Sequence, residues 1–278
     1  MSKLLDNVEE QKESRNVVYD ADGIIFLSAY KYKDTENIEL IYADFFMRIH
    51  SIEAEIWKSY AVDKTVIAIT SKKNFRHALT DRWKADRKAK PESEMTDKQL
   101  ESHREALKLK TLVSQVKALL AKRLSSSIVT VNSIAEADDT FIDLCNNQDY
   151  IGVSMDSDCI NQSMTPVFNY HSKHWKWVHE GRTEEEIFRH ILTDTITGGH
   201  NGNFGVKGVG VKGAEKFIAQ LESGEKTFSD WVDLFETPED ALLNYRVADC
   251  GQVVNGKLKL MEITNIAELF EDLLVAPF

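Results

Sequence analysis

The sequence predicts an α/β protein, because short apolar runs alternate with long amphipathic stretches along the chain. Three of the apolar runs lead into acidic residues, at Asp20, at 136–139 and at 156–158. Open α/β sheets place their binding sites beyond the carboxyl ends of the strands. These acidic residues are therefore the first candidates for function.

The composition limits the classes of protein to which the chain can belong. Its 278 residues, 42% hydrophobic and 28% charged, are typical of a soluble globular protein with one or two domains. A net charge of −11 argues against a generally basic nucleic-acid binder but allows a local basic groove. The cysteines lack C-x-x-C spacing, which predicts a reducing compartment and neither a zinc nor a disulfide framework. The polar start and the lack of a long apolar run predict a cytoplasmic protein with no membrane partner.

The first part of the chain contains two predicted strands with a long helix between them. The run at 16–19 is a short strand ending at Asp20, which is either a metal ligand or a cap of the helix that follows. Apolar residues at spacings of three and four predict a core helix over 34–60. The run at 65–70 is a second buried strand, and Ser71 follows it.

A basic segment follows the second strand, in a chain that is otherwise acidic. Lys84 and Arg87 are three residues apart, and Arg76 lies just before them. Cations interleaved with aromatic residues such as Trp83 fit phosphate neutralisation and base stacking. A solvated basic face is the alternative, and the local reversal of charge favours phosphate contact. The amphipathic helix predicted over 98–124 is also basic, so it is either an arch over the site or an ordinary crossover helix.

Two acidic clusters, each behind an apolar run, carry the strongest indication of chemistry. Their members are Glu136, Asp138 and Asp139 in the first and Asp156 and Asp158 in the second. On a helix, Glu136 and Asp139 share one face. Carboxylates at this density repel one another unless a cation neutralises them, and oxygen ligands suit Mg²⁺ or Mn²⁺ rather than Zn²⁺. A solvated helix start is the alternative for either cluster alone, but two clusters behind two strands favour a metal site.

The second half of the chain contains a pattern that predicts contact with DNA. A hairpin over 164–178 and a helix over 184–196 precede a glycine-rich stretch that runs into a helix at 215–221. The sequence G-V-K-G-V-G-V-K-G, which starts at Gly205, is that of a helix–hairpin–helix, whose second helix directs backbone N–H groups at a phosphate. It lacks the G-K-[ST] of a nucleotide loop, and we assign none of the scattered histidines to catalysis. Further helices are predicted around 231–235 and 266–274.

Taken in order, these motifs resemble the 5′-nuclease family, which includes bacteriophage 5′→3′ exonucleases, flap endonucleases and the 5′-nuclease domain of bacterial DNA polymerase I. The resemblance covers roughly residues 16–225 and rests on V-Y-D-A-D-G, N-F-R…W-K-A-D-R-K, E-A-D-D, M-D-S-D and G-V-K-G-V-G. It implies a central, mostly parallel sheet with helices on both faces, a helical arch at about 88–124 and a helix–hairpin–helix at about 196–221. It also implies an α/β core over 1–180 and a helical region over 181–278, in one compact unit.

The resemblance also implies roles for individual residues. The ligands of Mg²⁺ or Mn²⁺ would be Asp20, Glu136, Asp138, Asp139, Asp156 and Asp158. The residues that act on the scissile phosphate would be Lys84, Arg87 and Arg76. The residues in contact with DNA would be Trp83 (in place of the usual Tyr), Lys88, Gly205, Lys207, Gly208, Gly210 and Lys212. Backbone carbonyls of the helix–hairpin–helix would also hold K⁺.

The chain departs from the family pattern at three positions that bear on a second metal ion. Ser71 stands where the family has Asp at the end of its second site strand. Gly199 and Gly202 stand at the two acidic positions of the family's G-D-x-x-D-N. One metal site is therefore largely complete, whereas the second has lost the ligands from its loop. Replacement of those ligands by Asp194, His200, Asn201 or Asn203 is not the favoured interpretation.

The resemblance predicts a Mg²⁺-dependent 5′→3′ exonuclease or flap endonuclease that hydrolyses DNA by a two-metal mechanism, impaired at Ser71, Gly199 and Gly202. Its partner would be DNA with 5′ ends, flaps or junctions between single strand and duplex, bound by a monomer. The alternative is a branched-DNA-binding protein on the same scaffold that does not cut. The compact length suggests a phage source, with the host cytoplasm as the location.

Overall fold

The computed structural model describes residues 12–70, 74–81, 83, 91–198 and 205–258. Its strands are β1 (Ser14–Asp20), β2 (Ala61–Ala68), β3 (Val129–Thr130), β4 (Tyr150–Val153), β5 (Val167–Asn169), β6 (Lys176–Trp177), β7 (Val253–Val254) and β8 (Lys257–Leu258). The first six form one sheet in the order β3-β2-β1-β4-β5-β6, and β7 and β8 form a small second sheet.

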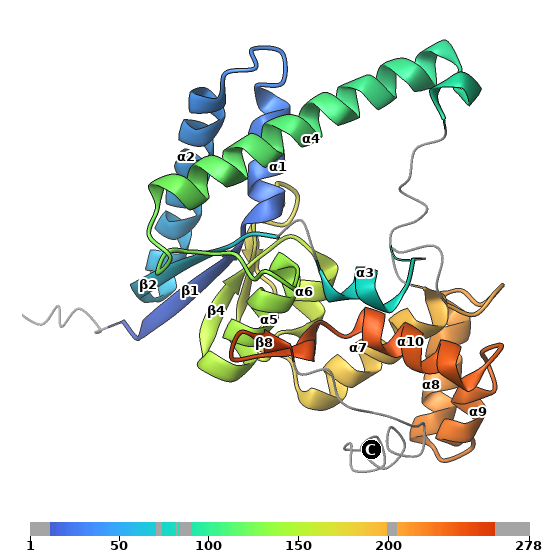
Figure 1. Cartoon of the computed structure of the whole chain (residues 1–278). Helices are drawn as coiled ribbons and strands as arrows, with labels where there is room; N and C mark the ends of the chain where they lie inside the picture. The colour runs from blue at the N-terminus through green and yellow to red at the C-terminus, as the bar shows by residue number, and fades with distance from the viewer. Residues whose placement is uncertain (1–11, 71–73, 82, 84–90, 199–204, 259–278) are drawn as a thin grey trace, which may run out of the picture.

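Helices cover both faces of the six-stranded sheet (Figure 1). The described residues form the helices α1 (Ala21–Lys31), α2 (Ile38–Ser59), α3 (Phe75–Leu79), α4 (Asp97–Arg123), α5 (Ala137–Gln148), α6 (Ser157–Gln162), α7 (Glu184–Thr197), α8 (Val211–Glu222), α9 (Phe228–Val232) and α10 (Pro238–Ala248), with 3-10 turns η2 (Glu92–Glu94) and η3 (Cys250–Gln252). Of these, α8, α9 and α10 lie beside α7, away from the sheet. The predicted α/β class is confirmed.

The direction and order of the strands create a crevice beside β1. Neighbouring strands from β3 to β5 are parallel, and only β5 and β6 pair antiparallel, as the predicted hairpin requires. Because β1 lies between β2 and β4, the chain order reverses between β1 and β4. Tyr19 pairs with Val153, so the residues that follow them leave the sheet side by side. Such a switch point is where open α/β sheets bind ligands.

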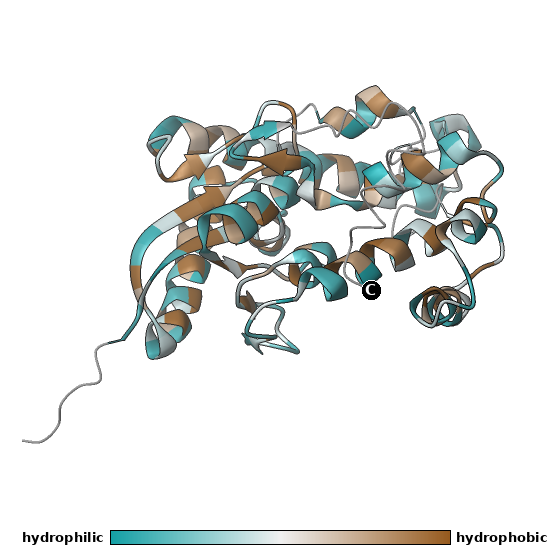
Figure 2. Cartoon of the chain, turned by 90° about the horizontal axis from the view of Figure 1, so that it is seen from below, coloured by the Kyte–Doolittle hydropathy of each residue, from teal (hydrophilic) through white to brown (hydrophobic). Residues whose placement is uncertain are grey.

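Alternation along β1 distributes its side chains between two apolar layers. Val17 and Tyr19 belong to the core formed with α1, α2 and α4, whereas Val18 belongs to the core formed with α5. This is the two-residue period of a strand that is buried on both faces. The helices alternate brown and teal in Figure 2, as expected for elements with one apolar and one polar face. The core therefore holds the strand ends rigidly from both sides.

Most predicted elements lie where the periodicity indicated, with shifts at their ends. The helices expected over 34–60, 98–124 and 184–196 are α2, α4 and α7. The strand expected to run into the second acidic cluster instead ends at Val153, because Asp156 caps α6. The sequence did not predict α10, and the helix expected over 266–274 lies outside the described residues.

Helix α4 extends well beyond the core. Its first buried residue is Leu109, and none of residues 97–108 is buried. The later part of the helix, including Leu112 and Val116, packs in the core with α1 and α2. In Figure 1 the first half of α4 projects past the body of the protein, as the predicted arch requires. Among the described helices, none combines the length and apolarity needed to span a bilayer.

The link between α7 and α8 has the close packing of the predicted helix–hairpin–helix. The N–H of Val206 donates to the carbonyl of Ile196 at 2.7 Å, and Val206 and Val209 pack in the apolar cluster formed by the two helices, as predicted. Gly205 has φ +95°, and a Cβ there would lie 2.3 Å from the backbone nitrogen of Gly198. Only glycine fits that approach.

Candidate metal centre at the strand ends

A cavity of about 460 Å³ lies beyond the carboxyl ends of β1 and β4, at the switch point of the sheet. It brings together four of the acids that the sequence indicated as metal ligands. We call Asp20, Glu136, Asp138 and Asp156 the strand-end cluster. The other residues that line the cavity are Asp22, Gly23, Thr70, Met155 and His171. The four acids come from three separate parts of the chain, so the fold itself assembles them.

Asp20, the last residue of β1, is buried and fixed by two hydrogen bonds. Its Oδ2 accepts from Ser154 Oγ at 2.9 Å, and its Oδ1 accepts from the N–H of Asp22 at 3.3 Å. Asp20 therefore caps α1 and also lines the cavity, so the two interpretations left open by the sequence are compatible. Ser154 Oγ also accepts from the N–H of Asp156 at 2.9 Å. One buried hydroxyl thus links the ends of β1 and β4.

The acids at the start of α5 divide between two environments. Glu136 and Asp138 line the cavity, but Asp139 does not. Asp139 is 0% exposed; its Oδ2 accepts from the N–H of Glu136 at 2.9 Å, and both its oxygens accept from Arg76 at 2.7 Å. The shared helical face of Glu136 and Asp139 is therefore used for capping. The expected metal-ligand role of Asp139 stays a prediction; in this structure its oxygens accept from the backbone of Glu136 and from Arg76.

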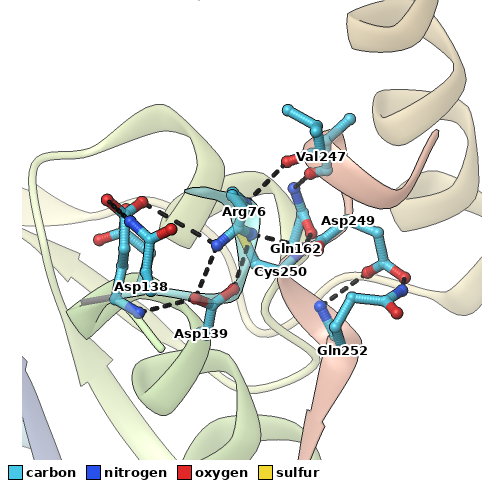
Figure 3. Close-up of polar contacts among 12 residues, drawn as sticks. Arg76, Asp138, Asp139, Gln162, Val247, Asp249, Cys250 and Gln252 are labelled. Carbon is cyan, nitrogen blue, oxygen red and sulfur yellow. Dashed lines mark hydrogen bonds and ion pairs between the residues drawn. The ribbon is translucent and has the colours of Figure 1, made fainter. Parts of the chain in front are cut away.

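Arg76 is enclosed by partners rather than directed at the cavity (Figure 3). Besides Asp139, its guanidinium donates to the carbonyls of Val247 and Asp249 at 3.0 and 3.3 Å, and it is 3.9 Å from Glu136 Oε2. The residue is 2% exposed. Arg76 ties α3 to α5 and to the end of α10, and its expected action on the scissile phosphate stays a prediction.

Trp83 is also buried, at 5% exposed, in a small apolar cluster with Val247 and Leu243. Its ring centroid lies 5.3 Å from the guanidinium of Arg76. Trp83 packs against these neighbours, and its expected stacking on DNA stays a prediction. Six other predicted positions lie outside the described residues. Three belong to the basic segment, Lys84, Arg87 and Lys88, and three stand where the family pattern has metal ligands, Ser71, Gly199 and Gly202.

Burial and mutual repulsion favour the protonated forms of Asp20 and Asp138. The pKa of Asp20 is raised to about 7, first by burial and then by the charge of Asp22. The pKa of Asp138 is raised well above its ordinary value, first by burial and then by the charges of Asp20 and Asp156. A divalent cation reverses both effects, because it favours the ionised carboxylates. The lining acids offer only oxygen, which fits Mg²⁺ or Mn²⁺.

Three residues near the cavity were missed by sequence reasoning. Lys117, from α4, places Nζ 2.7 Å from Asp22 Oδ1, and this oxygen also accepts from the N–H of Thr70 at 3.3 Å. The thiol of Cys159 donates to Asp138 Oδ1 at 3.7 Å, and burial raises the pKa of that thiol well above its ordinary value. The D-A-D-G sequence was a signal for Asp22, whereas no local pattern indicated Lys117 or Cys159.

Asp158 is not among the residues that line the cavity. Its Oδ1 lies 3.5 Å from His190 Nε2, which lies 3.6 Å from Asp194 Oδ2. We call Asp158, His190 and Asp194 the α6–α7 cluster; their ligand atoms all lie within 4.8 Å of one another. The four-residue spacing of His190 and Asp194 was an available signal, although sequence reasoning had set both aside.

The predicted DNA-contacting residues of the helix–hairpin–helix surround the start of α8. Lys207 and Lys212 are exposed, and Gly208 has φ +82°, a conformation that favours glycine. Gly210 is the N-cap of α8, and none of the side chains that the structure describes caps this helix. Exposed cations beside an uncapped helix N-terminus form a surface that attracts anions.

No protein-family model and no curated protein matches the chain. Among solved structures, the T5 D15 protein, co-crystallised with metal ions, superposes with a TM-score of 0.57 and 15% identity over 86% of this chain and 90% of that chain. The chain therefore shares the fold of the T5 D15 protein. The catalytic core of Rad2 in complex with DNA substrate gives a TM-score of 0.48 and 15% identity over 93% of this chain and 77% of that chain.

The described residues have the architecture expected from the motifs. It combines the mostly parallel sheet, the projecting helix α4 and the glycine-rich link before α8 in one arrangement (Figure 1). The likeness at 15% identity concerns the fold. What the site does follows from its own geometry.

Proposed function

We propose that this chain is a divalent-metal-dependent nuclease that hydrolyses DNA phosphodiesters at 5′ ends and flaps. The observation that carries the proposal is the convergence of the strand-end cluster in one cavity at the switch point of the sheet. The raised pKa values of Asp20 and Asp138 support a cation site, because these carboxyls cannot all ionise there without one. The 5′-nuclease fold supports phosphodiester hydrolysis as the reaction.

In this proposal, acids of the strand-end cluster hold the metal, and neighbouring residues hold those acids in place. Asp20, Asp138 and Asp156 would hold Mg²⁺ or Mn²⁺ through carboxylate oxygens. A bound divalent cation supplies an activated water and stabilises charge on the phosphodiester. Ser154 orients the acids at the ends of β1 and β4, since it bonds to both segments. The buried guanidinium of Arg76 fixes the start of α5, on which Asp138 lies.

Contacts to DNA would come from two sides of the cavity. Lys207, Lys212 and the uncapped start of α8 would bind the phosphates of duplex DNA, with K⁺ held by nearby carbonyls. Lys117 brings a cation from the projecting helix α4 to the edge of the cavity. Lys84 and Arg87 would meet the scissile phosphate. A 5′ strand passing beneath α4 would thus meet positive charge before it reached the carboxylates.

A branched-DNA-binding protein that does not cut is the second candidate. Ser71, Gly199 and Gly202 favour it, because each stands where the family pattern has a metal-binding Asp. Loss of a metal ligand weakens the stabilisation of charge in the transition state, which is usually the largest contribution to the rate. Fewer acids also repel DNA phosphate less, so binding to DNA would persist.

Cleavage of a labelled 5′-flap duplex in Mg²⁺ and in Mn²⁺, with gel-shift binding measured in parallel, separates the two candidates. The nuclease proposal expects a cleavage product that disappears with a chelator and with Asp138→Asn. Asp63→Asn is the matched control, because Asp63 is exposed on β2. Binding without a product, together with a product from the Gly199→Asp/Gly202→Asp variant, would favour the binding protein. A chain that neither binds nor cuts contradicts both candidates.

A further inference from the structure

The α6–α7 cluster brings a nitrogen and two carboxylate oxygens together where two helices meet. Asp158 lies in the first turn of α6, while His190 and Asp194 are four residues apart on α7 and so share one face of that helix. None of the three lines the strand-end cavity. The cluster is therefore a second group of potential ligands, separate from the strand-end cluster.

Distances within the α6–α7 cluster fit ligands of one ion better than hydrogen bonds. His190 Nε2 lies 3.5 Å from Asp158 Oδ1 and 3.6 Å from Asp194 Oδ2. Hydrogen bonds from nitrogen to oxygen are shorter, at about 2.7–3.2 Å. Ligand atoms about 2.1 Å from a tetrahedral ion lie about 3.4 Å from one another. The two measured separations are therefore close to the distance expected between two ligand atoms of one tetrahedral ion.

A protonated imidazole between two carboxylates is the alternative to a bound ion: although burial lowers the pKa of His190, Asp158 and Asp194 raise it. Nε2 of His190 carries at most one hydrogen, which can be directed at only one of the two carboxylates. This nitrogen is buried and has no hydrogen-bond partner within the part of the chain that the structure describes. The side chains of His190, Asp158 and Asp194 are 19%, 29% and 20% exposed, so the cluster is still open to an ion from solvent.

We propose that the α6–α7 cluster is a divalent-metal site that takes a transition-series cation such as Zn²⁺ or Co²⁺ in preference to Mg²⁺. Imidazole nitrogen suits such cations, whereas Mg²⁺ takes oxygen ligands and gives up its water reluctantly. The four acids of the strand-end cluster offer oxygen, and burial raises the pKa of the neighbouring Cys159 thiol, which disfavours its thiolate, so this cluster has the opposite preference. The first turn of α6 thus serves two sites, with Asp156 at one and Asp158 at the other.

This inference goes beyond the proposed nuclease and does not depend on it. Metal binding by the α6–α7 cluster is measured without DNA, so a chain that never cuts DNA still gives a result. Conversely, a cluster that binds no metal leaves the strand-end cluster and the proposed function unchanged. The two proposals therefore fail separately.

The test is a Co²⁺ titration of the metal-free, full-length chain, followed by its visible absorption, with Zn²⁺ and excess Mg²⁺ as competitors. We expect one bound Co²⁺ per chain that Zn²⁺ displaces and Mg²⁺ does not. His190→Gln should lower the affinity of this ion by at least about tenfold, because losing a ligand costs no less than losing a group that supports one. Asp194→Asn provides the same test if His190→Gln does not fold.

Two further variants serve as controls for the titration. His50→Gln changes an exposed histidine of α2 and should leave the Co²⁺ spectrum and affinity unchanged. Asp138→Asn should remove only the ion that Mg²⁺ displaces. The inference is overturned if Mg²⁺ displaces all bound Co²⁺, or if His190→Gln and Asp194→Asn, folded as judged by thermal unfolding, both bind Co²⁺ like the unchanged chain.

Discussion

The strand-end cluster and the α6–α7 cluster differ in what brings their ligands together. Sheet topology places the first, because Asp20 ends β1 and Asp156 follows β4 at the switch point. Helix packing places the second, because Asp158 meets His190 and Asp194 only where α6 contacts α7. A site at strand ends is thus a consequence of the fold class, whereas a site between helices depends on the particular packing.

The ligand chemistry of the two clusters differs in the same way. The strand-end cluster is entirely carboxylate, and burial raises the pKa of two of its members. The α6–α7 cluster contains an imidazole nitrogen. Oxygen-only sites suit Mg²⁺ and imidazole suits transition metals, so a variant that removes one cluster should spare the other.

The largest expected effect comes from Asp20→Asn. We expect Mg²⁺-dependent flap cleavage to fall about a thousandfold, because transition-state charge loses part of its stabilisation. His190→Gln should change cleavage in Mg²⁺ far less, since its cluster favours a different metal. Single-turnover cleavage of both variants, with Asp63→Asn as the exposed control, makes the comparison. Equal losses in both variants would mean that the two clusters act as one site.

Arg76→Met should destabilise the fold by about 3–5 kcal/mol, because it leaves the buried carboxylate of Asp139 without its partner. Urea unfolding measures this change. The matched control is Arg123→Met, which breaks a solvent-exposed pair with Glu39 and should change the stability far less. A stable Arg76→Met variant that loses only cleavage would instead support direct action on the phosphate.

The metal-free chain should lose stability as pH rises from about 4 to about 7. Folded Asp20 keeps its proton up to a pKa of about 7, whereas the unfolded chain releases it near the ordinary value of 3.8. The folded state is therefore favoured at low pH, by about 1.4 kcal/mol for each pKa unit, and this advantage disappears as pH reaches 7. Unfolding at several pH values, with and without Mg²⁺, checks the slope. Asp20→Asn should flatten it, and a slope that the substitution leaves unchanged contradicts the assignment.

Lys117→Met is expected to have the smallest effect. Removing the ammonium beside Asp22 should raise the Mg²⁺ affinity of the strand-end cluster by roughly threefold, as expected for a partly exposed pair. Co²⁺ binding at the α6–α7 cluster should not change. Lys108→Met is the control for calorimetric titration: Lys108 lies on α4 like Lys117, and it pairs with Glu36, which precedes α2. Identical Mg²⁺ affinities for all three proteins would place Lys117 outside the influence of the cavity.

Local periodicity predicted much of the fold. The strand ending at Asp20 and the helices α2, α4 and α7 follow from spacings within a few residues of each other. The same reasoning missed α10, and with it the surroundings of Arg76 and Trp83, which α10 helps to bury. In the sequence, a residue of a basic stretch that faces solvent cannot be distinguished from one that faces the core.

The sequence predicted which acids gather near the strand ends, but not which of their side chains face the cavity. Glu136, Asp138 and Asp139 are nearly adjacent, yet capping and the pairing with Arg76 turn Asp139 inward. The sequence alone cannot distinguish such neighbours, because the partner of Asp139 lies on another helix. Sequence reasoning missed His190 for the same reason, because Asp158, whose Oδ1 lies 3.5 Å from His190 Nε2, is distant in sequence.

Diffraction from crystals soaked in Mn²⁺, recorded for anomalous scattering, tests the central claim most directly. The account predicts a peak in the strand-end cavity, about 2.1–2.2 Å from carboxylate oxygens of Asp20, Asp138 or Asp156. Asp138→Asn crystals should show a weaker peak or none. A cavity without anomalous signal in the unchanged chain, at Mn²⁺ concentrations that saturate ordinary carboxylate sites, would contradict the account.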